Sequence, residues 1–200
     1  MSVANGQNPT LTVFVGPMFS SKTTRLLGAL ERYKLQHKKV MVFKPAVDDR
    51  YSDTEIISHS GWKHPASAVS EGADILAALA DAPEQPDVVA VDEAFMISGV
   101  AEVLSWLYRT GITIVVSTLD MGYQGKPFHE IEKLLPWATH IEKCSAVCTE
   151  CGRDAYYTHK KHVTGDEVVN ATEIGGAEKY EARCFRHHLA IDNRPKIHEG

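Results

Sequence analysis

The sequence predicts an α/β fold, a parallel sheet with helices on both faces, followed by a small metal-binding unit. From residue 11 to about residue 143, short apolar runs alternate with segments of helical spacing, such as residues 73–79 and 100–108, which is typical of a parallel sheet. Beyond residue 143 this alternation stops, and pairs of cysteine and histidine take its place. A chain of 200 residues can bury a core and allows one domain with a small appendage.

The first apolar run, Leu11 to Val15, leads through a short loop into a segment of helical spacing. Strand, loop and helix in this order can hold a triphosphate, because the loop N–H groups and the helix N-terminus face it. There Lys22 would reach the β- and γ-phosphates, and the Thr23 hydroxyl would hold Mg²⁺. A βα turn with a stray lysine is the alternative. The predicted phosphate-binding residues are Gly16, Pro17, Met18, Phe19, Ser20, Ser21, Lys22 and Thr23.

An acidic pair follows the apolar run Val88 to Val91. A strand that ends in Asp92 and Glu93 is what a Mg-ATP site needs opposite its phosphate loop. One carboxylate binds the Mg²⁺ shell, and the next acts as a base or orients a water molecule. Acidic residues also begin many helices, so this pair alone would be weak evidence. Together with the loop at residues 16–23, it predicts a Mg-ATP site.

Another predicted strand, at residues 40–43, precedes the polar loop that contains Asp48, Asp49 and Arg50. Open α/β sheets bind ligands at the carboxyl ends of their strands, where this loop begins. Asp48 and Arg50 are therefore candidates to contact Mg²⁺ and phosphate. The alternative is a solvated turn, since charge composition alone does not distinguish the two.

The run at residues 112–116 is the clearest buried strand of the chain, and the loop at residues 119–128 leaves its carboxyl end. Tyr123 and Phe128 in this loop are candidates to stack on a flat ligand. Aromatic side chains in such places more often belong to the core, so that alternative stays open.

Two short pairs of metal-binding side chains lie beyond the predicted sheet. A C-x-x-C pair and a C-x-x-H pair each bring two ligands, which suits a tetrahedral Zn²⁺ site. Four protein ligands leave no open position, so the predicted zinc is structural. A redox C-x-x-C would instead stand at a helix start in a thioredoxin-like unit. The predicted ligands are Cys148, Cys151, Cys184 and His187, with His188 as an alternative fourth ligand and Cys144 as a buried thiol.

The predicted zinc would join the two ends of a long segment, residues 152–183, that has little apolar core of its own. A segment fixed in this way can fold over a ligand as a lid. The chain is therefore divided into a flexible lead-in (1–9), a P-loop ATP-binding domain (10–143), a zinc-binding domain with a substrate-covering loop (144–189) and a flexible tail (190–200).

Charge and hydropathy narrow the choice of partners. The net charge of −5 gives no overall basic field of the kind that attracts nucleic acid. No run of 18 apolar residues is present, and the first residues lack the basic and apolar regions of a signal peptide. We expect no nucleic-acid partner, no membrane span and a cytoplasmic location, where the four cysteines are thiols or metal ligands.

With these motifs in this order, the chain resembles the thymidine kinase family that carries a zinc ribbon, the cytosolic vertebrate, bacterial and phage type. The resemblance covers residues 11–189 and implies a RecA-like P-loop sheet with a zinc-ribbon lid. It also implies transfer of the ATP γ-phosphoryl group to the 5′-OH of thymidine, with deoxyuridine as a further candidate. The matching segments are GPMFSSKT at 16–23, KPAVDDRYS at 44–52, VDEAF at 91–95, LDMGYQGKPF at 119–128, AVCTEC at 146–151 and EIGGAEKYEARCFRH at 173–187.

The resemblance implies roles for the matched residues. Glu93 would be the general base that takes the proton of the 5′-OH, and Asp92 would serve Mg²⁺. Asp48 and Arg50 would lie by the phosphates and the reacting hydroxyl. Family members are commonly homotetramers, and dTTP inhibits them by filling the site. The implied substrate-binding residues are Tyr123, Phe128, Ala171, Thr172, Glu173, Ile174, Gly175 and Tyr180.

Two departures from the family pattern bear on activity. Ser21 stands where the family has glycine, so its Cβ would crowd the phosphate or shift the loop dihedrals. After Glu93 the family reads x-Gln-Phe, whereas this chain reads Ala94-Phe95-Met96, which alters the expected pocket wall.

Two rival predictions of function remain open. One is a nucleic-acid-dependent P-loop ATPase, which the acidic net charge disfavours, and the other is a nucleotide-binding relative with impaired catalysis.

Overall fold

The computed structural model describes residues 8–48, 54–58, 60–161 and 175–188. Within these residues, six strands form a parallel sheet in the order β5-β2-β6-β7-β1-β8. The predicted parallel α/β fold is confirmed. The strands are β1 (Leu11–Val15), β2 (Val40–Pro45), β5 (Ser67–Val69), β6 (Val88–Val91), β7 (Thr113–Thr118) and β8 (His140–Lys143).

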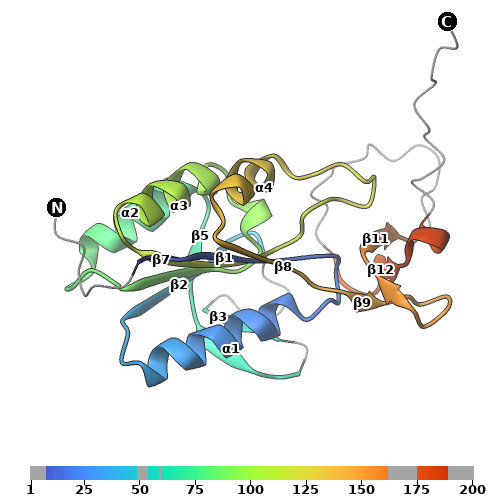
Figure 1. The fold of residues 1–200 in the computed structure, drawn as a ribbon, viewed down its shortest axis with the longest axis horizontal. Helices are drawn as coiled ribbons and strands as arrows, with labels where there is room; N and C mark the ends of the chain where they lie inside the picture. Colours follow the sequence, from blue (N-terminus) through green and yellow to red (C-terminus); the bar gives the residue numbers. More distant parts are fainter. Residues whose placement is uncertain (1–7, 49–53, 59, 162–174, 189–200) are drawn as a thin grey trace, which may run out of the picture.

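Helices cover both faces of this sheet (Figure 1). One face carries α1 (Lys22–Leu35), and the other carries α2 (Gly72–Asp81), α3 (Val100–Arg109) and α4 (His129–Leu134). Short 3₁₀ turns, η1 (Ala94–Met96) and η2 (Leu135–Trp137), follow β6 and α4. Among the described residues, no helix has the length and hydropathy needed to cross a bilayer.

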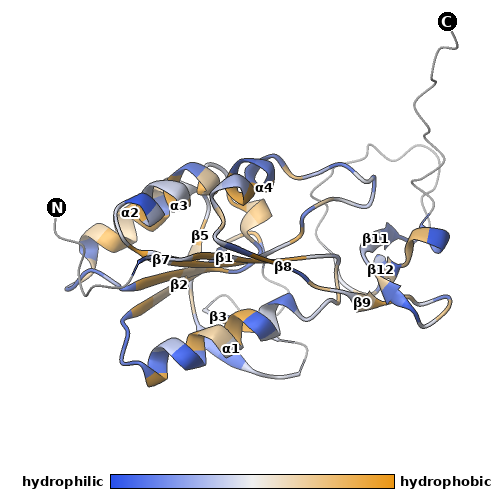
Figure 2. Ribbon diagram, in the orientation of Figure 1, coloured by the Kyte–Doolittle hydropathy of each residue, from blue (hydrophilic) through white to orange (hydrophobic). Residues whose placement is uncertain are grey.

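The central strands β1, β6 and β7 are largely apolar because both of their faces are buried (Figure 2). In β6, Val89 and Val91 join the core cluster that α3 and α4 cover, while Val88 and Ala90 join the cluster on the α1 side. Successive side chains of a strand point to opposite faces, so an unbroken apolar run fills two cores at once. Asp92, the first residue after this run, is thereby placed at the carboxyl end of β6.

A second group of short strands lies beyond the end of the sheet, where Figure 1 shows them in orange and red. They form two antiparallel pairs, β9 with β10 and β11 with β12. A third pair, β3 (Glu55–Ile57) with β4 (Lys63–Pro65), is an antiparallel hairpin in the β2–β5 connection. The other elements are β9 (Ala146–Val147), β10 (Asp154–Ala155), β11 (Tyr157–Lys160), β12 (Tyr180–Arg183) and η3 (Phe185–His187).

Two helical glycines lead to opposite predictions for alanine substitution. A Cβ at Gly28, in α1, would meet nothing within 4 Å, so Gly28→Ala should raise the free energy of unfolding. The expected gain is about 1 kcal/mol, from helix propensity. A Cβ at Gly72 would lie 2.6 Å from the Gly99 carbonyl oxygen, where α2 meets the start of α3. Gly72→Ala should therefore lower that free energy by roughly 1–3 kcal/mol.

Urea unfolding of the two variants measures both changes. An unchanged or higher free energy of unfolding in Gly72→Ala would contradict the close approach of α2 to the start of α3, and a lower one in Gly28→Ala would contradict the open space at Gly28.

Candidate active site

The loop between β1 and α1 begins at a glycine that packing requires. Gly16 has φ +150, and a Cβ built on it would lie 2.3 Å from the backbone oxygen of Cys144. The amide of Cys144 in turn donates to the Val15 carbonyl at 2.7 Å. The start of the predicted phosphate loop therefore lies against the backbone that leads from β8 into β9.

The same loop closes around the ammonium group of Lys22. The Nζ atom donates to the Pro17 carbonyl at 2.6 Å, and Ser20 Oγ donates to the same oxygen at 2.8 Å. Burial lowers the pKa of Lys22, while the carboxylates of Glu93 and Asp92 act in the opposite direction. The Nζ atom of Lys22 is thus buried inside the loop and close to two acidic residues.

Three non-glycine residues of the site have left-handed backbone conformations, which cost roughly 1–2 kcal/mol each for residues with a Cβ. They are Phe19 (φ 67), Ser21 (φ 58) and Glu93 (φ 49). At Ser21 the family pattern has glycine, which adopts this conformation without strain. Ser21 keeps the left-handed conformation although it has a Cβ, and its exposed side chain lines the pocket.

Asp92 receives hydrogen bonds from two neighbouring elements. Thr23 Oγ1, at the start of α1, donates to Asp92 Oδ2 at 3.1 Å, and Ser117 Oγ, in β7, donates to Oδ1. Burial, followed by the charge of Glu93, raises the pKa of Asp92 to about 7. A buried carboxylate beside a hydroxyl offers the hard oxygen ligands that Mg²⁺ prefers. The pair Thr23 and Asp92 therefore fits the predicted magnesium site.

One pocket joins the loop, the acidic pair and the polar residues after β2. Asp48 is buried and lines this pocket, and its backbone oxygen accepts a hydrogen bond from Lys44 Nζ at 2.5 Å. Asp48 is thus buried although the turn before it, at residues 46–47, is exposed, whereas Asp49 and Arg50 lie outside the described residues. The lining residues are Met18, Phe19, Ser20, Ser21, Lys22, Thr23, Thr24, Lys44, Pro45, Asp48, Glu55, Ile56, Ile57, Asp92, Glu93 and Gly176.

Sequence reasoning missed part of this pocket. Lys44 lies in the matching segment at 44–52 but was assigned no role, and the β3 residues Glu55 to Ile57 carry no motif; the fold brings both to the phosphate loop. Gly176, at the far end of the segment between the cysteine pairs, also lines it. The predicted lid segment therefore reaches the pocket with at least this residue.

The two aromatic residues of the loop after β7 have different environments. Tyr123 lies 6.3 Å from Tyr180 of β12, measured between ring centroids, and Lys160 Nζ lies 5.7 Å from its ring. Phe128 is buried in the core, with its ring 4.4 Å from that of Phe95. The shifted aromatic residue after the acidic pair thus packs on Phe128.

Tyr123 and Tyr180 therefore lie together, as the predicted substrate side requires, while Phe128 packs in the core. Gly175 immediately precedes the pocket residue Gly176. The remaining predicted substrate residues, Ala171, Thr172, Glu173 and Ile174, lie outside the described residues.

The two cysteine pairs converge on one point. All four candidate ligand atoms lie within 4.8 Å of one another. Cys151 Sγ lies 3.8 Å from Cys184 Sγ, and His187 Nδ1 lies 3.4 Å from Cys184 Sγ and 3.6 Å from Cys148 Sγ. With Zn–S bonds of about 2.3 Å, two sulfurs on a tetrahedral ion lie about 3.8 Å apart. The Cys₃His group therefore fits structural zinc.

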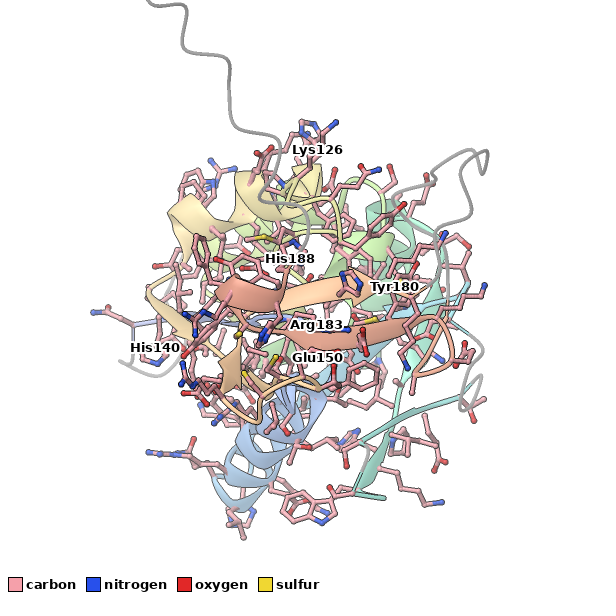
Figure 3. The ribbon with its side chains drawn as sticks, turned by 90° about the vertical axis from the view of Figure 1, so that its right-hand side faces the viewer. Lys126, His140, Glu150, Tyr180, Arg183 and His188 are labelled. Atoms are coloured by element: carbon pink, nitrogen blue, oxygen red, sulfur yellow. The ribbon has the colours of Figure 1, made fainter. Side chains whose placement is uncertain are left out.

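Hydrogen bonds and an ion pair around the Cys₃His group favour metal binding there. Burial raises the pKa of Cys148, but hydrogen bonds from the Cys184 backbone and the His187 ring outweigh it and give a value of about 6. That value favours the thiolate that a metal ligand needs. Arg183 forms a 2.7 Å ion pair with Glu150, so β12 is tied to the C-x-x-C turn (Figure 3).

Geometry separates the two adjacent histidines. His188 is buried, but its ring stacks on Tyr157 with 4.8 Å between centroids and an interplanar angle of 16°. His187, not His188, stands in the Cys₃His group. Cys144 is buried outside that group, as predicted.

Zinc content provides a test of the metal site. Cys151→Ser removes a ligand with an exposed side chain, so we expect loss of most bound zinc and a lower Tm. Cys144→Ala changes a buried cysteine outside the group and should keep one zinc per chain. Elemental analysis and thermal unfolding report both quantities. Full zinc occupancy in Cys151→Ser would contradict the ligand assignment.

The left-handed conformation of Ser21 also leads to a prediction. Ser21→Gly should relieve the strain and raise the free energy of unfolding by about 1 kcal/mol. Ser20→Gly is the matched control, because it removes the hydrogen bond to Pro17 without relieving a positive φ, and it should lower stability. Chemical denaturation compares the two, and equal destabilisation by both would rule out strain at Ser21.

Comparison with known proteins agrees with this arrangement. A family model described as thymidine kinase matches residues 9–188. The chain is also 37% identical over 191 residues to a thymidine kinase of the bacterium Deinococcus deserti, across 90% of this chain and 94% of that protein. The residues that the family model matches include the phosphate loop, the acidic pair and the Cys₃His group. The chain belongs to the thymidine kinase family.

Proposed function

We propose that this protein transfers the γ-phosphoryl group of ATP to the 5′-OH of thymidine, giving dTMP. As a member of its family, the chain is an ATP-dependent nucleoside kinase. The observation that carries the proposal is the pocket in which the Thr23–Asp92 hydrogen bond, the loop lysine Lys22 and the second acidic residue Glu93 meet. Phosphoryl transfer requires this combination of positive charge, metal ligands and a base.

The donor side is formed by the phosphate loop and Asp92. The loop amides and the N-terminus of α1 would bind the phosphate oxygens, and Lys22 would neutralise part of their charge. Thr23 and Asp92 would hold Mg²⁺, which when bound neutralises charge on the β- and γ-phosphates. Asp48 lies in the same pocket, on the side of β2. These residues bind and orient ATP without covalent chemistry.

Glu93 is the proposed general base. It follows the magnesium ligand directly and lines the same pocket, so its carboxylate is available to the hydroxyl that attacks the γ-phosphorus atom. Its left-handed backbone, with φ 49 and ψ 42, turns the chain sharply after β6. A base held by a constrained backbone keeps its position relative to Asp92 as the substrate enters.

The acceptor side is proposed to include Tyr123, Tyr180 and Gly175, with deoxyuridine as a further substrate to be tested. The predicted lid at residues 152–183 would exclude water, which otherwise competes for the phosphoryl group; its residues 162–174 lie outside the described residues. Inhibition by dTTP and a homotetrameric assembly belong to the same proposal, on the basis of the family. Light scattering measures the assembly, and dTMP formation at increasing dTTP measures the inhibition.

Removal of the base is the most direct test of the mechanism. Glu93→Gln should keep the fold and bind Mg-ATP, yet lose about 10²–10⁴-fold in kcat, as expected for a general base. Glu132→Gln, on the exposed surface of α4, is the control and should leave kcat unchanged. Chromatographic measurement of dTMP gives both rates, and near-normal turnover by Glu93→Gln would remove Glu93 from the mechanism.

A substrate panel separates this function from its two rivals. Purified protein with Mg-ATP is given each of four deoxynucleosides, and phosphorylated product is measured. We expect product with thymidine and little or none with the purine nucleosides. ATP hydrolysis stimulated by single-stranded DNA would favour a nucleic-acid-dependent ATPase instead. ATP binding without any product would identify a catalytically impaired relative.

A further inference from the structure

The strands β9 to β12 and the turn η3 form the Cys₃His unit, which contacts the phosphate loop through a hydrogen bond. The backbone N–H of Met18 donates to Thr158 Oγ1 at 3.1 Å. Thr158 belongs to β11 and is 3% exposed, so the acceptor of this bond is buried, while Met18 is half-buried. A backbone amide in the middle of the phosphate loop is therefore held by a side chain of the Cys₃His unit, 140 residues away in the sequence.

The next residue of the loop touches the same unit through its ring. Phe19 packs against the buried cluster formed by Ala146, Cys148, Ala155, Ala182 and Cys184. Two of these residues, Cys148 and Cys184, are candidate zinc ligands. Phe19 also has a left-handed backbone, which a residue with a Cβ adopts only where its surroundings impose it. The zinc ligands are thus part of the surface that supports this conformation.

The first residue of the loop completes the contact. Gly16 lies against the backbone oxygen of Cys144, and the chain continues from Cys144 directly into β9 of the Cys₃His unit. The loop is consequently held at Gly16, Met18 and Phe19 by the backbone, a hydroxyl and a packed cluster of that unit. On its other side the loop continues into α1, which packs on the sheet.

We propose that the zinc site controls the conformation of the phosphate loop, so that zinc and ATP bind with positive coupling, and that Thr158 is the positioning residue. The proposal rests on the ATP site proposed above. Without the metal, the three cysteine side chains and the imidazole are no longer joined by a common ion, and the cluster under Phe19 loosens. Linkage is reciprocal, so zinc must raise the affinity for ATP by the same factor as ATP raises the affinity for zinc.

Equilibrium binding tests the coupling without any measurement of turnover. Mg-ATP is titrated calorimetrically into zinc-loaded and zinc-depleted protein, and zinc affinity is measured by competition with a chelator, with and without saturating Mg-ATP. We expect ATP to bind about 5–50-fold more tightly to the zinc-loaded form, with the same factor in the zinc titration. Coupling factors of one in the zinc titration would overturn the proposal, even where the depleted protein unfolds.

Substitutions at Thr158 assign the coupling to the hydrogen bond. Thr158→Val keeps the shape but leaves the Met18 N–H without an acceptor, so zinc-loaded Thr158→Val should bind Mg-ATP about 5–20-fold more weakly. Thr158→Ser restores the hydroxyl and should bind within about 2-fold of the original chain. The zinc–ATP coupling factor should fall in Thr158→Val alone. A lower Tm with an unchanged coupling factor would show a structural role only and would overturn the assignment.

The ring of Phe19 has a matched control in the same unit. Phe19→Leu should weaken Mg-ATP binding, whereas Phe185→Leu changes a ring that is 65% exposed and should not. Equal effects of the two substitutions would argue against a specific contact. If zinc-loaded protein binds no Mg-ATP, the proposed kinase function itself fails. If it binds Mg-ATP with and without zinc equally, only the coupling fails.

Discussion

The hydrogen bonds on Asp92 join the parts of the molecule on which its chemistry depends. Asp92 follows β6, Ser117 belongs to β7, and Thr23 is the second residue of α1, the helix after β1. In the sheet β7 lies between β6 and β1, so the carboxyl ends of three adjacent strands converge on a single carboxylate. This convergence depends on parallel strands in register, because Val91 pairs with Val116 and Val15 with Thr118. A shift of any one strand would separate Asp92 from the hydroxyl groups that donate to it.

Much of the fold could be predicted because both faces of the central strands are buried. Runs of mainly apolar residues revealed β1, β6 and β7, and the loops that leave their carboxyl ends located most of the site. The edge strands had no such signal. The side chains of β8 are mostly exposed, and β5 has only three residues, one of them buried. Pairing with a neighbour, and not hydrophobicity, makes these segments strands.

The candidate site also contains residues that the sequence identified and residues that only the structure revealed. Spacing identified the two metal-binding pairs but could not choose between His187 and His188, since either residue can follow Cys184 at ligand distance. The 3₁₀ turn at residues 185–187 brings His187 to the cysteines and sends the ring of His188 towards Tyr157. The β3 residues Glu55 to Ile57 had no sequence motif, because only tertiary structure brings them to the pocket. The left-handed residues were equally hidden, because backbone strain at Phe19 and Glu93 opposes local preference and depends on surrounding structure.

The two-sided burial of β6 has a consequence for how sequences of this kind can change. Side chains along a strand alternate with a period of two, so a deletion or insertion of one residue would exchange the two cores that β6 fills. The same event would turn the residue after the strand towards the opposite face. The length of the apolar run Val88 to Val91 therefore determines to which face the carboxylate of Asp92 points. Hydrophobic substitutions that preserve volume are tolerable along β6, whereas a change in its length would remove the catalytic geometry even if the sheet still formed.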